Sequence, residues 1–420
     1  MPDFLITSET ALSRRDFFRA VGGASDWLHR QGVICGERVA LMLPPGPELL
    51  SLLFGCWRLG AIACLPSTRL PAAAVDTFLA EVGCSRRIIE YTLTLGSEWQ
   101  LSLPDEQQVT LLWTSGSGAS PKAAVHTWDN FVSNARGSNA NIVLGPGDRW
   151  LLALPLYHVG GLSIVVRCLL AGAALVLPGA EQKAPPTHVS MVATQFLRME
   201  NAEKQNYKAI LLGGSALPRL LIERAYRTGL PIHTSYGMTE MASQIATTPP
   251  GADLEALCSS GKVLPEREVK VSNTGEILVK GKPLFQGYWD PQGLRRPLDE
   301  EGWFATGDLG YFDARGYLHI TGRKDNMFIS GGENIQPEEI EQVLLRFLGV
   351  IQVMVVPRVD PEFGQRPVAF IEGFYQEGAL KNYLAERLPK FKHPVAFYPW
   401  PEVLLISGIK PRRADFLKLV

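Results

Sequence analysis

The side chains best suited to phosphate chemistry lie in residues 114–127, which read TSGSGASPKAAVHT. The apolar run just before them, residues 109–113, predicts a buried strand, and the ends of such strands are where open α/β sheets bind ligands. Glycine N–H groups, hydroxyls and a lysine can together surround a polyphosphate. We therefore expect a phosphate-binding loop made of Thr114, Ser115, Gly116, Ser117 and Lys122. A solvated turn is the alternative.

This loop does not have the Walker pattern. A Walker loop places Gly-Lys-Ser/Thr at the start of a helix, whereas Pro121 precedes Lys122 here and Ala123 follows it. The sequence thus argues against a P-loop kinase or ATPase.

A second polar group follows the apolar residues 231–234. An aromatic ring beside a glycine can stack on a purine, Thr239 can donate to a phosphate, and Glu240 is an oxygen ligand suited to Mg²⁺ on a nucleotide. The group comprises Ser235, Tyr236, Gly237, Met238, Thr239 and Glu240. Upstream, Gly213, Gly214 and Ser215 end another apolar run and would let an adenine lie against backbone. A strand-to-helix turn with Thr239 as N-cap is the alternative, and both can hold because caps and phosphate sites use the same N–H groups.

Two further motifs each carry one charged side chain. Asp308 in TGDLG is placed to accept both hydroxyls of a ribose, and Arg323 in TGRKD could join it or reach a phosphate. A structural ion pair between Asp308 and Arg323 is the alternative.

Composition limits the class of protein. A chain of 420 residues with 46% hydrophobic content predicts two or more globular domains. A formal charge of −1 gives no general electrostatic reason to bind nucleic acid or an anionic membrane. Six scattered cysteines without a CxxC pair, and an N-terminus without signal-peptide features, favour a cytoplasmic protein without stable membrane insertion.

Hydrophobic periodicity predicts the elements that hold these groups. Helices are expected over residues 13–30 and 48–59, and strands over 38–43 and 61–65. Further short apolar runs favour parallel sheets covered by helices; they are residues 149–154, 173–177, 189–193, 209–212 and 232–235. Residues 268–280 and 309–320 read as hairpins, and the last 80 or so residues read as helix, strand, strand, helix and strand.

We therefore predict an α/β protein. Its large N-terminal domain, residues 1–322, would consist of helix-covered sheets plus a β-rich subdomain. A small mobile α+β domain, residues 323–420, would follow a polar hinge near Asp325.

Taken in order, the motifs SGSGASPK, SYGMTE, TGDLG, GRKDN and SGIKPRR resemble those of the adenylate-forming enzymes, which include acyl-CoA synthetases, peptide-synthetase adenylation domains and luciferases. The resemblance implies ATP, Mg²⁺ and coenzyme A as ligands, with Asp308 and Arg323 on the ribose and phosphates. It implies that Lys410, which locally reads as an ordinary surface lysine, bridges the α-phosphate and the acyl oxygen, with Thr239 and Glu240 as its catalytic partners. A lid turning about Asp325 would bring the loop Gly331-Gly332 to the second step.

Several stretches resemble one branch more closely, the o-succinylbenzoate–CoA ligases of menaquinone and phylloquinone synthesis. They are residues 121–127, 153–159, 194–198, 332–339 and 362–367. Such a substrate has a second carboxylate that needs a cation, and Arg198 is the candidate; Gln195 and His158 would line the acyl pocket. The alternatives are that Arg198 lies on the polar face of a helix over residues 195–201 and that His158 is a satisfied histidine at a helix start.

The phosphate loop departs from the family pattern. Gly118 replaces a threonine and Ala119 replaces a glycine, so one hydroxyl for the phosphates is absent. We expect the enzyme to be active, and expect the double substitution Gly118→Thr with Ala119→Gly to hold or raise the adenylation rate.

Three other interpretations compete. The substrate could be another aromatic or a medium-chain acid, or the chain could be an inactive nucleotide-binding homologue. A peptide-synthetase adenylation domain would normally be followed by a carrier domain, which is not found before Val420. The sequence leaves the oligomeric state open and is compatible with a homo-oligomer.

Overall fold

The computed structural model describes residues 3–67, 70–114, 122–199, 206–215, 217–402 and 413–420. The chain forms two compact units. The first contains Met1–Ala216, Gly229–Val269 and Val279–Phe304; the second contains Leu217–Thr228, Lys270–Leu278 and Ala305–Val420. The predicted boundary between residues 322 and 323 stays a prediction.

One sheet of the first unit has seven strands within the described residues. Its order is β18 (Gly293–Arg295), β17 (Gly287–Asp290), β7 (Lys122–Thr127), β6 (Gln108–Thr114), β4 (Ile62–Cys64), β3 (Arg38–Leu41) and β5 (Arg86–Ile88). Strands β6, β4, β3 and β5 run parallel, while β7 and β17 continue the sheet antiparallel. The sheet is therefore mixed, and its antiparallel part begins next to the predicted phosphate loop.

A second sheet has nine strands in the described part of the chain. Its order is β14 (Lys262–Val263), β13 (Ser243–Thr247), β12 (Ile232–Met238), β11 (Ala209–Leu212), β10 (His188–Met191), β8 (Arg149–Leu151), β9 (Ala174–Val176), β1 (Asp3–Ile6) and β2 (Ala11–Ser13). Its centre, from β12 to β1, is parallel as predicted, because these short apolar runs are buried and connected through helices. Its margins β13 and β2 are antiparallel.

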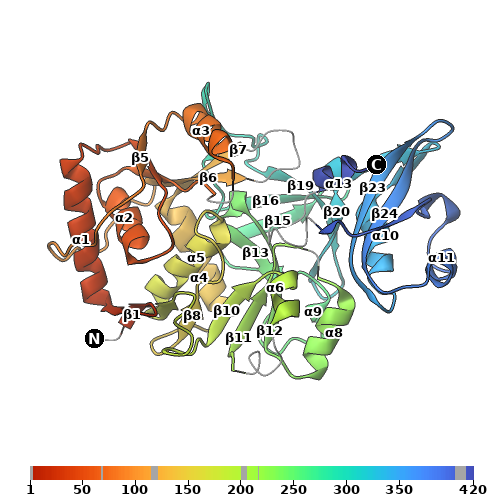
Figure 1. The fold of residues 1–420 in the computed structure, drawn as a ribbon, viewed down its shortest axis with the longest axis horizontal. Helices are drawn as coiled ribbons and strands as arrows, with labels where there is room; N and C mark the ends of the chain where they lie inside the picture. Colours follow the sequence, from red (N-terminus) through yellow and green to blue (C-terminus); the bar gives the residue numbers. More distant parts are fainter. Residues whose placement is uncertain (1–2, 68–69, 115–121, 200–205, 216, 403–412) are drawn as a thin grey trace. The chain divides into compact units, whose positions relative to one another are not determined.

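Local signals set the helix ends. Helix α1 (Arg14–Arg30) begins where the Ser13 hydroxyl accepts the Asp16 N–H, and the chain leaves it through Gly32 at φ 80°. Helix α2 (Pro47–Arg58) begins with a proline in its first turn and lies beside α1 (Figure 1). The other helices are α3 (Ala72–Glu81), α4 (Trp128–Asn141), α5 (Val159–Ala171), α6 (Ala193–Arg198), α8 (Arg219–Arg227), α9 (Leu254–Leu257), α10 (Pro337–Leu344), α11 (Glu377–Ala385) and α13 (Arg413–Leu417).

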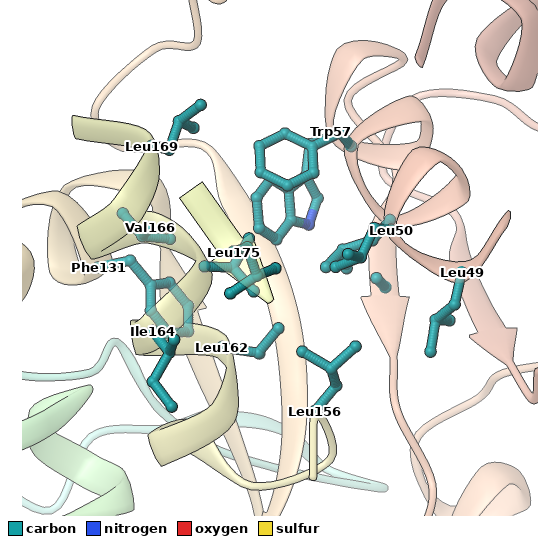
Figure 2. Packing of buried hydrophobic residues seen from close by; sticks show 14 of the residues in the cluster. Leu49, Leu50, Trp57, Phe131, Leu156, Leu162, Ile164, Val166, Leu169 and Leu175 are labelled. Carbon is teal, nitrogen blue, oxygen red and sulfur yellow. The ribbon is translucent and has the colours of Figure 1, made fainter. Parts of the chain in front are cut away.

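The main core of the first unit joins helices of both sheets. Leu50 and Trp57 of α2 face leucines and valines of α5 and Phe131 of α4 (Figure 2). Trp57 is 1% exposed, and its indole N–H donates to Val109 O at 2.8 Å, so even its polar atom is satisfied. This packing fixes α4 and α5, the helices that hold the site described below.

The second unit is built around small sheets. The predicted hairpins form part of the sheet β15 (Arg267–Val271), β16 (Glu276–Gly281), β19 (Phe304–Phe312) and β20 (Leu318–Arg323). They are followed by the hairpin β21 (Phe328–Ser330) and β22 (Glu333–Ile335), then by the sheet β23 (Val350–Asp360), β24 (Gly364–Gly373) and β25 (Phe397–Pro399). The predicted order of helix, strand, strand, helix and strand is confirmed. Helix α13 was not predicted.

Among the helices of the described residues, none combines the length and apolar character needed to cross a bilayer.

Candidate active site

The predicted phosphate loop lies between two antiparallel strands. Thr114, at the end of β6, is paired with Lys122 at the start of β7, and Thr114 is buried while Lys122 is exposed. Lys122 begins a strand rather than a helix, in agreement with the absence of a Walker pattern. Ser115, Gly116, Ser117 and the Gly118-Ala119 departure lie outside the described residues.

The ends of β11 and β12 meet closely. The Ser235 hydroxyl donates to Leu212 O at 3.0 Å, and a Cβ on Gly213 would lie 2.5 Å from that hydroxyl oxygen. A side chain at 213 would displace the Ser235 hydroxyl from this position. Gly214 has φ 76°, and Ser215 follows it with partial exposure. The structure therefore brings together the two glycine- and serine-containing segments that the sequence assigned to adenine, and a ligand role for them stays a prediction.

The segment after Ser235 differs from one expectation. Strand β12 continues to Met238, a single 3-10 turn covers Thr239–Met241, and the chain then returns as antiparallel β13. Met238 precedes this turn, and no side chain caps it, so the alternative of a strand-to-helix turn capped by Thr239 is wrong. Tyr236 is 9% exposed, so most of its ring is covered by protein.

The turn that leads from β12 back into β13 contains two residues with unusual backbone angles. Ala242 has φ 50° and Ser243 has φ 123°, whereas such values are rare for residues with a Cβ. Ala242 is also fully buried. Strained backbone of this kind persists only where its surroundings hold it, and it gathers at functional sites.

Side chains from distant elements supply that support. They form hydrogen bonds with carbonyl oxygens of the turn and of the strand after it. His126 Nε2 lies 2.7 Å from Thr239 O, and Ser163 Oγ lies 2.7 Å from Ala242 O. Asn134 Nδ2 lies 2.9 Å from both Met241 O and Gln244 O, and the Arg267 guanidinium also donates to Gln244 O. The backbone N–H of Phe285 donates to Glu240 O at 2.8 Å. We call these five residues the turn cradle. It holds the backbone of Thr239 and Glu240 in one geometry.

His126 acts in the cradle as a neutral donor. The ring is fully buried, and desolvation lowers its pKa to about 4, although its hydrogen bond to Thr239 O opposes that shift. The imidazole is therefore uncharged near neutral pH. Because the partner at Nε2 is a carbonyl oxygen, the ring proton lies on Nε2.

The Glu240 carboxylate is fixed by a phenol. Glu240 is 7% exposed, and the Tyr288 hydroxyl donates to Oε1 at 2.5 Å. No group of three or more His, Cys, Asp or Glu side chains is arranged to hold a metal in the described part of the chain. This donor set fits Mg²⁺ that arrives with a nucleotide, since such an ion uses one or two carboxylates together with phosphates and water.

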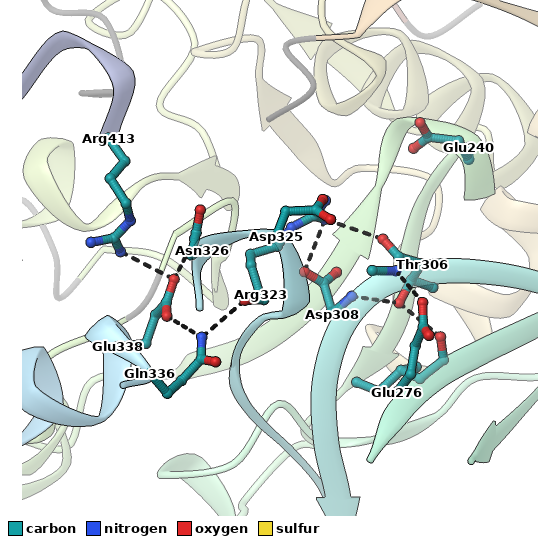
Figure 3. Close-up of polar contacts among 12 residues, drawn as sticks. Glu240, Glu276, Thr306, Asp308, Arg323, Asp325, Asn326, Gln336, Glu338 and Arg413 are labelled. Atoms are coloured by element: carbon teal, nitrogen blue, oxygen red, sulfur yellow. Dashed lines mark hydrogen bonds and ion pairs between the residues drawn. The ribbon is translucent and has the colours of Figure 1, made fainter. Parts of the chain in front are cut away.

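Asp308 and Arg323 are direct neighbours across β19 and β20 (Figure 3). Arg323 Nη1 lies 3.1 Å from Asp308 Oδ1, so the ion pair that was the alternative is present. The same guanidinium donates to Thr306 O at 3.1 Å and to Asp325 at 3.2 Å. Burial is the largest single influence and lowers the pKa of Arg323, but the charges of Asp308 and Asp325 and their hydrogen bonds together outweigh it, so the pKa rises and the guanidinium stays charged. Roles on ribose and phosphate stay predictions.

The predicted hinge residue Asp325 thus contacts the arginine of the preceding strand. Close to it, Gln336 Nε2 donates to Arg323 O at 2.9 Å, and Asn326 donates to Glu338 (Figure 3). Glu338 also pairs with Arg413 at 3.1 Å. Lys410 lies outside the described residues, whereas Arg413, three residues later, is firmly held in the second unit.

The three predicted acyl-site residues lie at helix ends. His158 precedes the first residue of α5 and is exposed, with its ring 4.7 Å from that of Tyr157. Gln195 and Arg198 are exposed on α6, which ends at Arg198 rather than residue 201. Gln195 Oε1 accepts the Val192 N–H at 3.0 Å, so it caps its own helix.

Gly331 and Gly332 form the turn of the β21–β22 hairpin. Their φ values are 57° and 88°, which favour glycine. Gly331 N donates to Phe363 O at 2.9 Å, and a Cβ on Gly331 would lie 2.7 Å from the Phe363 ring. The structure therefore places residues 331–332 beside the stretch 362–367.

Comparisons with known proteins decide the family. The AMP-binding enzyme model matches residues 3–102 and 97–289, and the AMP-binding enzyme C-terminal domain model matches residues 339–405. The chain belongs to the AMP-binding enzyme family. One relative, 2-succinylbenzoate–CoA ligase of Escherichia coli K12, is 37% identical over 388 residues, which cover 90% of this chain and 81% of the relative.

Solved structures of AMP-binding enzymes have the same fold. An arginine-to-lysine variant of MenE from E. coli with bound OSB-AMS has a TM-score of 0.89 at 33% identity, covering 100% of this chain and 95% of its own. The o-succinylbenzoate CoA synthetase of Bacillus subtilis in complex with ATP and magnesium ion has a TM-score of 0.85 at 28% identity, covering 98% and 94%. The α/β fold predicted from the hydrophobic pattern is confirmed.

Sequence reasoning missed most of the turn cradle of this AMP-binding enzyme. Asn134, Ser163, Arg267 and Phe285 were not assigned a role, and neither was His126; Tyr288, which contacts the Glu240 carboxylate, was missed as well. Their partners lie far away in the chain, 113 residues for His126 and 107 for Asn134. The only local signal was the presence of polar residues within otherwise apolar segments, such as Ser163 in α5.

Proposed function

We propose that this protein joins o-succinylbenzoate to coenzyme A at the expense of ATP. The reaction proceeds through an acyl-adenylate, releases pyrophosphate and then AMP, and serves menaquinone or phylloquinone synthesis. The observation that carries the proposal is the extent of the match to 2-succinylbenzoate–CoA ligase, 37% identity over 90% of the chain. The fixed position of Glu240 beside Tyr288 supports it independently, because a nucleotide-borne cation needs such a carboxylate.

In the first step the substrate carboxylate attacks the α-phosphate of ATP. Two anions approach each other, so the site must supply positive charge where negative charge develops. Lys122 and Lys410 would supply it from the chain, and Thr239 would donate to a phosphate oxygen. Mg²⁺, bound by Glu240 and the phosphates, would neutralise further charge when present. Asp308 and Arg323 would hold the ribose and phosphates.

In the second step the thiol of coenzyme A attacks the acyl carbon and displaces AMP. Its approach differs from that of ATP, which is a physical reason for a movable domain. The domain of residues 323–420 would turn near Asp325, replacing Lys410 with the hairpin turn of Gly331 and Gly332. Absence of a Cβ at that turn would let the thiol-bearing chain pass close to backbone.

Arg198 would bind the carboxylate that is not activated, with Gln195 and His158 beside the acyl group. Arg198 is exposed, and within the described residues it makes no ion pair. A charged, outward-facing guanidinium is suited to bidentate recognition of a carboxylate.

The experiment measures pyrophosphate release, AMP and thioester from o-succinylbenzoate, ATP and coenzyme A, omitting each in turn. All three products should form only in the complete mixture, while pyrophosphate alone should form without coenzyme A. A panel of aromatic and medium-chain acids tests the substrate. No product with any acid would establish an inactive homologue, and a better monocarboxylate would establish a different ligase.

Arg198→Ala tests the dicarboxylate interpretation. Loss of a charge-assisted contact should raise KM for o-succinylbenzoate by roughly tenfold or more and leave KM for ATP unchanged. Arg198→Lys keeps the charge but lacks the planar guanidinium, so its KM for o-succinylbenzoate should lie between those of the unmodified protein and Arg198→Ala. Unchanged turnover of o-succinylbenzoate in Arg198→Ala would contradict the assignment.

We also infer that the protein works in the cytoplasm on these small molecules. Size-exclusion chromatography with light scattering would determine whether it forms a homo-oligomer. Neither inference affects the assignment of the reaction.

A further inference from the structure

Tyr288 on β17 contacts two side chains that the proposed reaction needs. Its hydroxyl donates to Glu240 Oε1, and the Lys122 ammonium lies 5.0 Å from the centre of its ring. Tyr288 is 8% exposed. Its side chain therefore lies between the carboxylate assigned to the metal and the lysine assigned to phosphate.

The position of Tyr288 is set from several sides. Strand β17 pairs antiparallel with β7, which places Tyr288 opposite Ala124, two residues after Lys122. The ring of Phe285 packs edge-on against the Tyr288 ring, with centres 4.8 Å apart. Phe285 also donates its N–H to Glu240 O, so one short segment fixes both the backbone and the carboxylate of Glu240.

A small surface pocket opens at this point. Its volume is about 200 Å³, and its lining includes Lys122, Tyr288 and Arg295. Among the described residues, neither Lys122 nor Arg295 pairs with a carboxylate, although Glu81 and Asp290 also line the pocket. Within the part of the chain that the structure describes, the Lys122 ammonium therefore has an aromatic face beside it and no carboxylate as an ion-pair partner.

The two contacts differ in chemistry. A phenol that donates to a carboxylate forms a strong, directional bond, and it fixes which way the carboxylate points. The face of the ring attracts an ammonium whether or not the hydroxyl is present. Removing the hydroxyl alone should therefore disturb Glu240 and spare Lys122.

We propose that Tyr288 is a positioning residue that orients the Glu240 carboxylate through its hydroxyl and the Lys122 ammonium through its ring. This inference rests on the proposed function, because it assumes that Glu240 and Lys122 serve Mg²⁺ and ATP. Tyr288 itself contacts neither the reacting carboxylate nor the α-phosphate in this scheme.

The test distinguishes the role of the Tyr288 hydroxyl from that of its ring. Calorimetry measures the equilibrium binding of ATP without acyl substrate, once in Mg²⁺ and once in EDTA. Tyr288→Phe should weaken ATP binding about tenfold in Mg²⁺, the effect of one charge-assisted hydrogen bond, and leave it unchanged in EDTA. Tyr288→Leu should weaken binding under both conditions, since Lys122 loses the ring. Tyr311→Phe, which removes an exposed hydroxyl in the second unit, is the matched control and should bind as the unmodified protein does.

A double substitution tests the route through Glu240. In a Glu240→Gln background, Tyr288→Phe should have little further effect on the Mg²⁺ dependence, because the group it orients is already lost. Additive losses would show that the hydroxyl acts elsewhere. Thermal unfolding of each variant shows whether it is folded, and a folded Tyr288→Phe with normal Mg²⁺-dependent binding overturns the proposal.

Failure of the proposed function would look different. An unmodified protein that binds ATP and Mg²⁺ but forms no thioester would refute the ligase and leave the Tyr288 test intact. Thioester formation with a normal Tyr288→Phe would refute only the role of Tyr288.

Discussion

At the scale of single residues, His126 is the group whose charge the fold controls most clearly. It is buried against Thr239 O, and its pKa is about 4, below the value of about 6.5 for an unfolded chain. The unfolded chain therefore binds a proton between these values and the folded protein does not. Stability from this group is complete above pH 6.5 and is lost as the pH falls toward 4.

We predict that this loss amounts to about 1.4 kcal/mol per pH unit in that window. Urea unfolding at a series of pH values would measure it. His126→Asn keeps a hydrogen-bond donor but does not titrate. In this variant the slope of unfolding free energy against pH should therefore decrease by the amount that corresponds to one bound proton. Equal slopes for His126→Asn and the unmodified protein would contradict the assignment.

The pairing of Asp308 with Arg323 could be predicted from sequence, whereas their roles on ribose and phosphate stay predictions. Asp308 and Arg323 were expected to act together, and the register of β19 and β20 places them opposite each other although they are 15 residues apart. The contact between Tyr288 and Glu240 was not expected. It joins strand β17 to a turn 48 residues earlier, and nothing in either segment indicates the other.

At the scale of elements, α4 acts as a support for the turn through a single amide. Asn134 Nδ2 donates to two carbonyls of that turn, and all the groups involved are buried. We predict that Asn134→Ala costs about 1–3 kcal/mol, because Met241 O loses the amide donor while Gln244 O retains the Arg267 guanidinium, and that it raises KM for ATP as Glu240 becomes less well placed. Denaturant unfolding and adenylation kinetics would measure both.

Asn139 on the same helix is the control. Its amide donates to one carbonyl, Arg167 O at 3.2 Å, outside the turn. Asn139→Ala should cost about 1 kcal/mol and leave KM for ATP unchanged. Equal effects of the two substitutions on KM would mean that the turn needs no support from α4.

Helix α13 is attached by an ion-pair network of its own. Arg413 pairs with Glu341 at 2.8 Å and with Glu338 at 3.1 Å, and its side chain is only 14% exposed. Burial raises the pKa of Glu341 while the charge of Arg413 opposes the shift, so the carboxylate depends on its partner. We predict that Arg413→Met costs about 3–5 kcal/mol of unfolding free energy, because it leaves buried carboxylates unpaired.

Lys418 directly after α13 offers the comparison. Its ammonium lies 3.6 Å from Asp415 and is 73% exposed, so Lys418→Met should change stability by less than about 0.5 kcal/mol. Both variants would be compared by denaturant unfolding. A small effect of Arg413→Met would show that α13 is held by Phe416 and the aromatic rings around it instead.

Element prediction failed where pairing outweighed local preference. The polar residues of SYGM gave no strand signal, yet they continue β12 because β13 supplies hydrogen bonds along them. A strand lengthened by its neighbour cannot be recognised in a window of sequence. The parallel centre of the sheet was predicted correctly because its apolar runs carry their own signal.

At the scale of the whole molecule, the proposed two-step reaction assigns different parts of the chain to different steps. Gly332 has φ 88° and open space where a Cβ would lie, so an added methyl meets no neighbour but strains the backbone. We predict that Gly332→Ala slows thioester formation roughly tenfold, about 1.4 kcal/mol in the barrier, and leaves pyrophosphate exchange unchanged. Separate assays of the two half-reactions would measure this.

Gly316→Ala is the matched control for Gly332→Ala. Gly316 has φ 78°, also with nothing near its Cα, and lies in the turn between β19 and β20. Both variants should lose similar stability, whereas only Gly332→Ala should affect the second half-reaction. A change in pyrophosphate exchange in Gly332→Ala would contradict the assignment of that hairpin to coenzyme A.

Because the turn at Ala242 and Ser243 has a strained backbone, the SYGMTE motif depends on residues outside itself. The backbone of the turn is maintained by hydrogen bonds from His126, Asn134, Ser163 and Arg267, and these four side chains have no contact with nucleotide in the proposed scheme. Transplanting the six residues SYGMTE into another scaffold would carry the functional groups without the means to hold them. Conversely, substitutions of the supporting residues can change KM for ATP although the sequence SYGMTE stays the same.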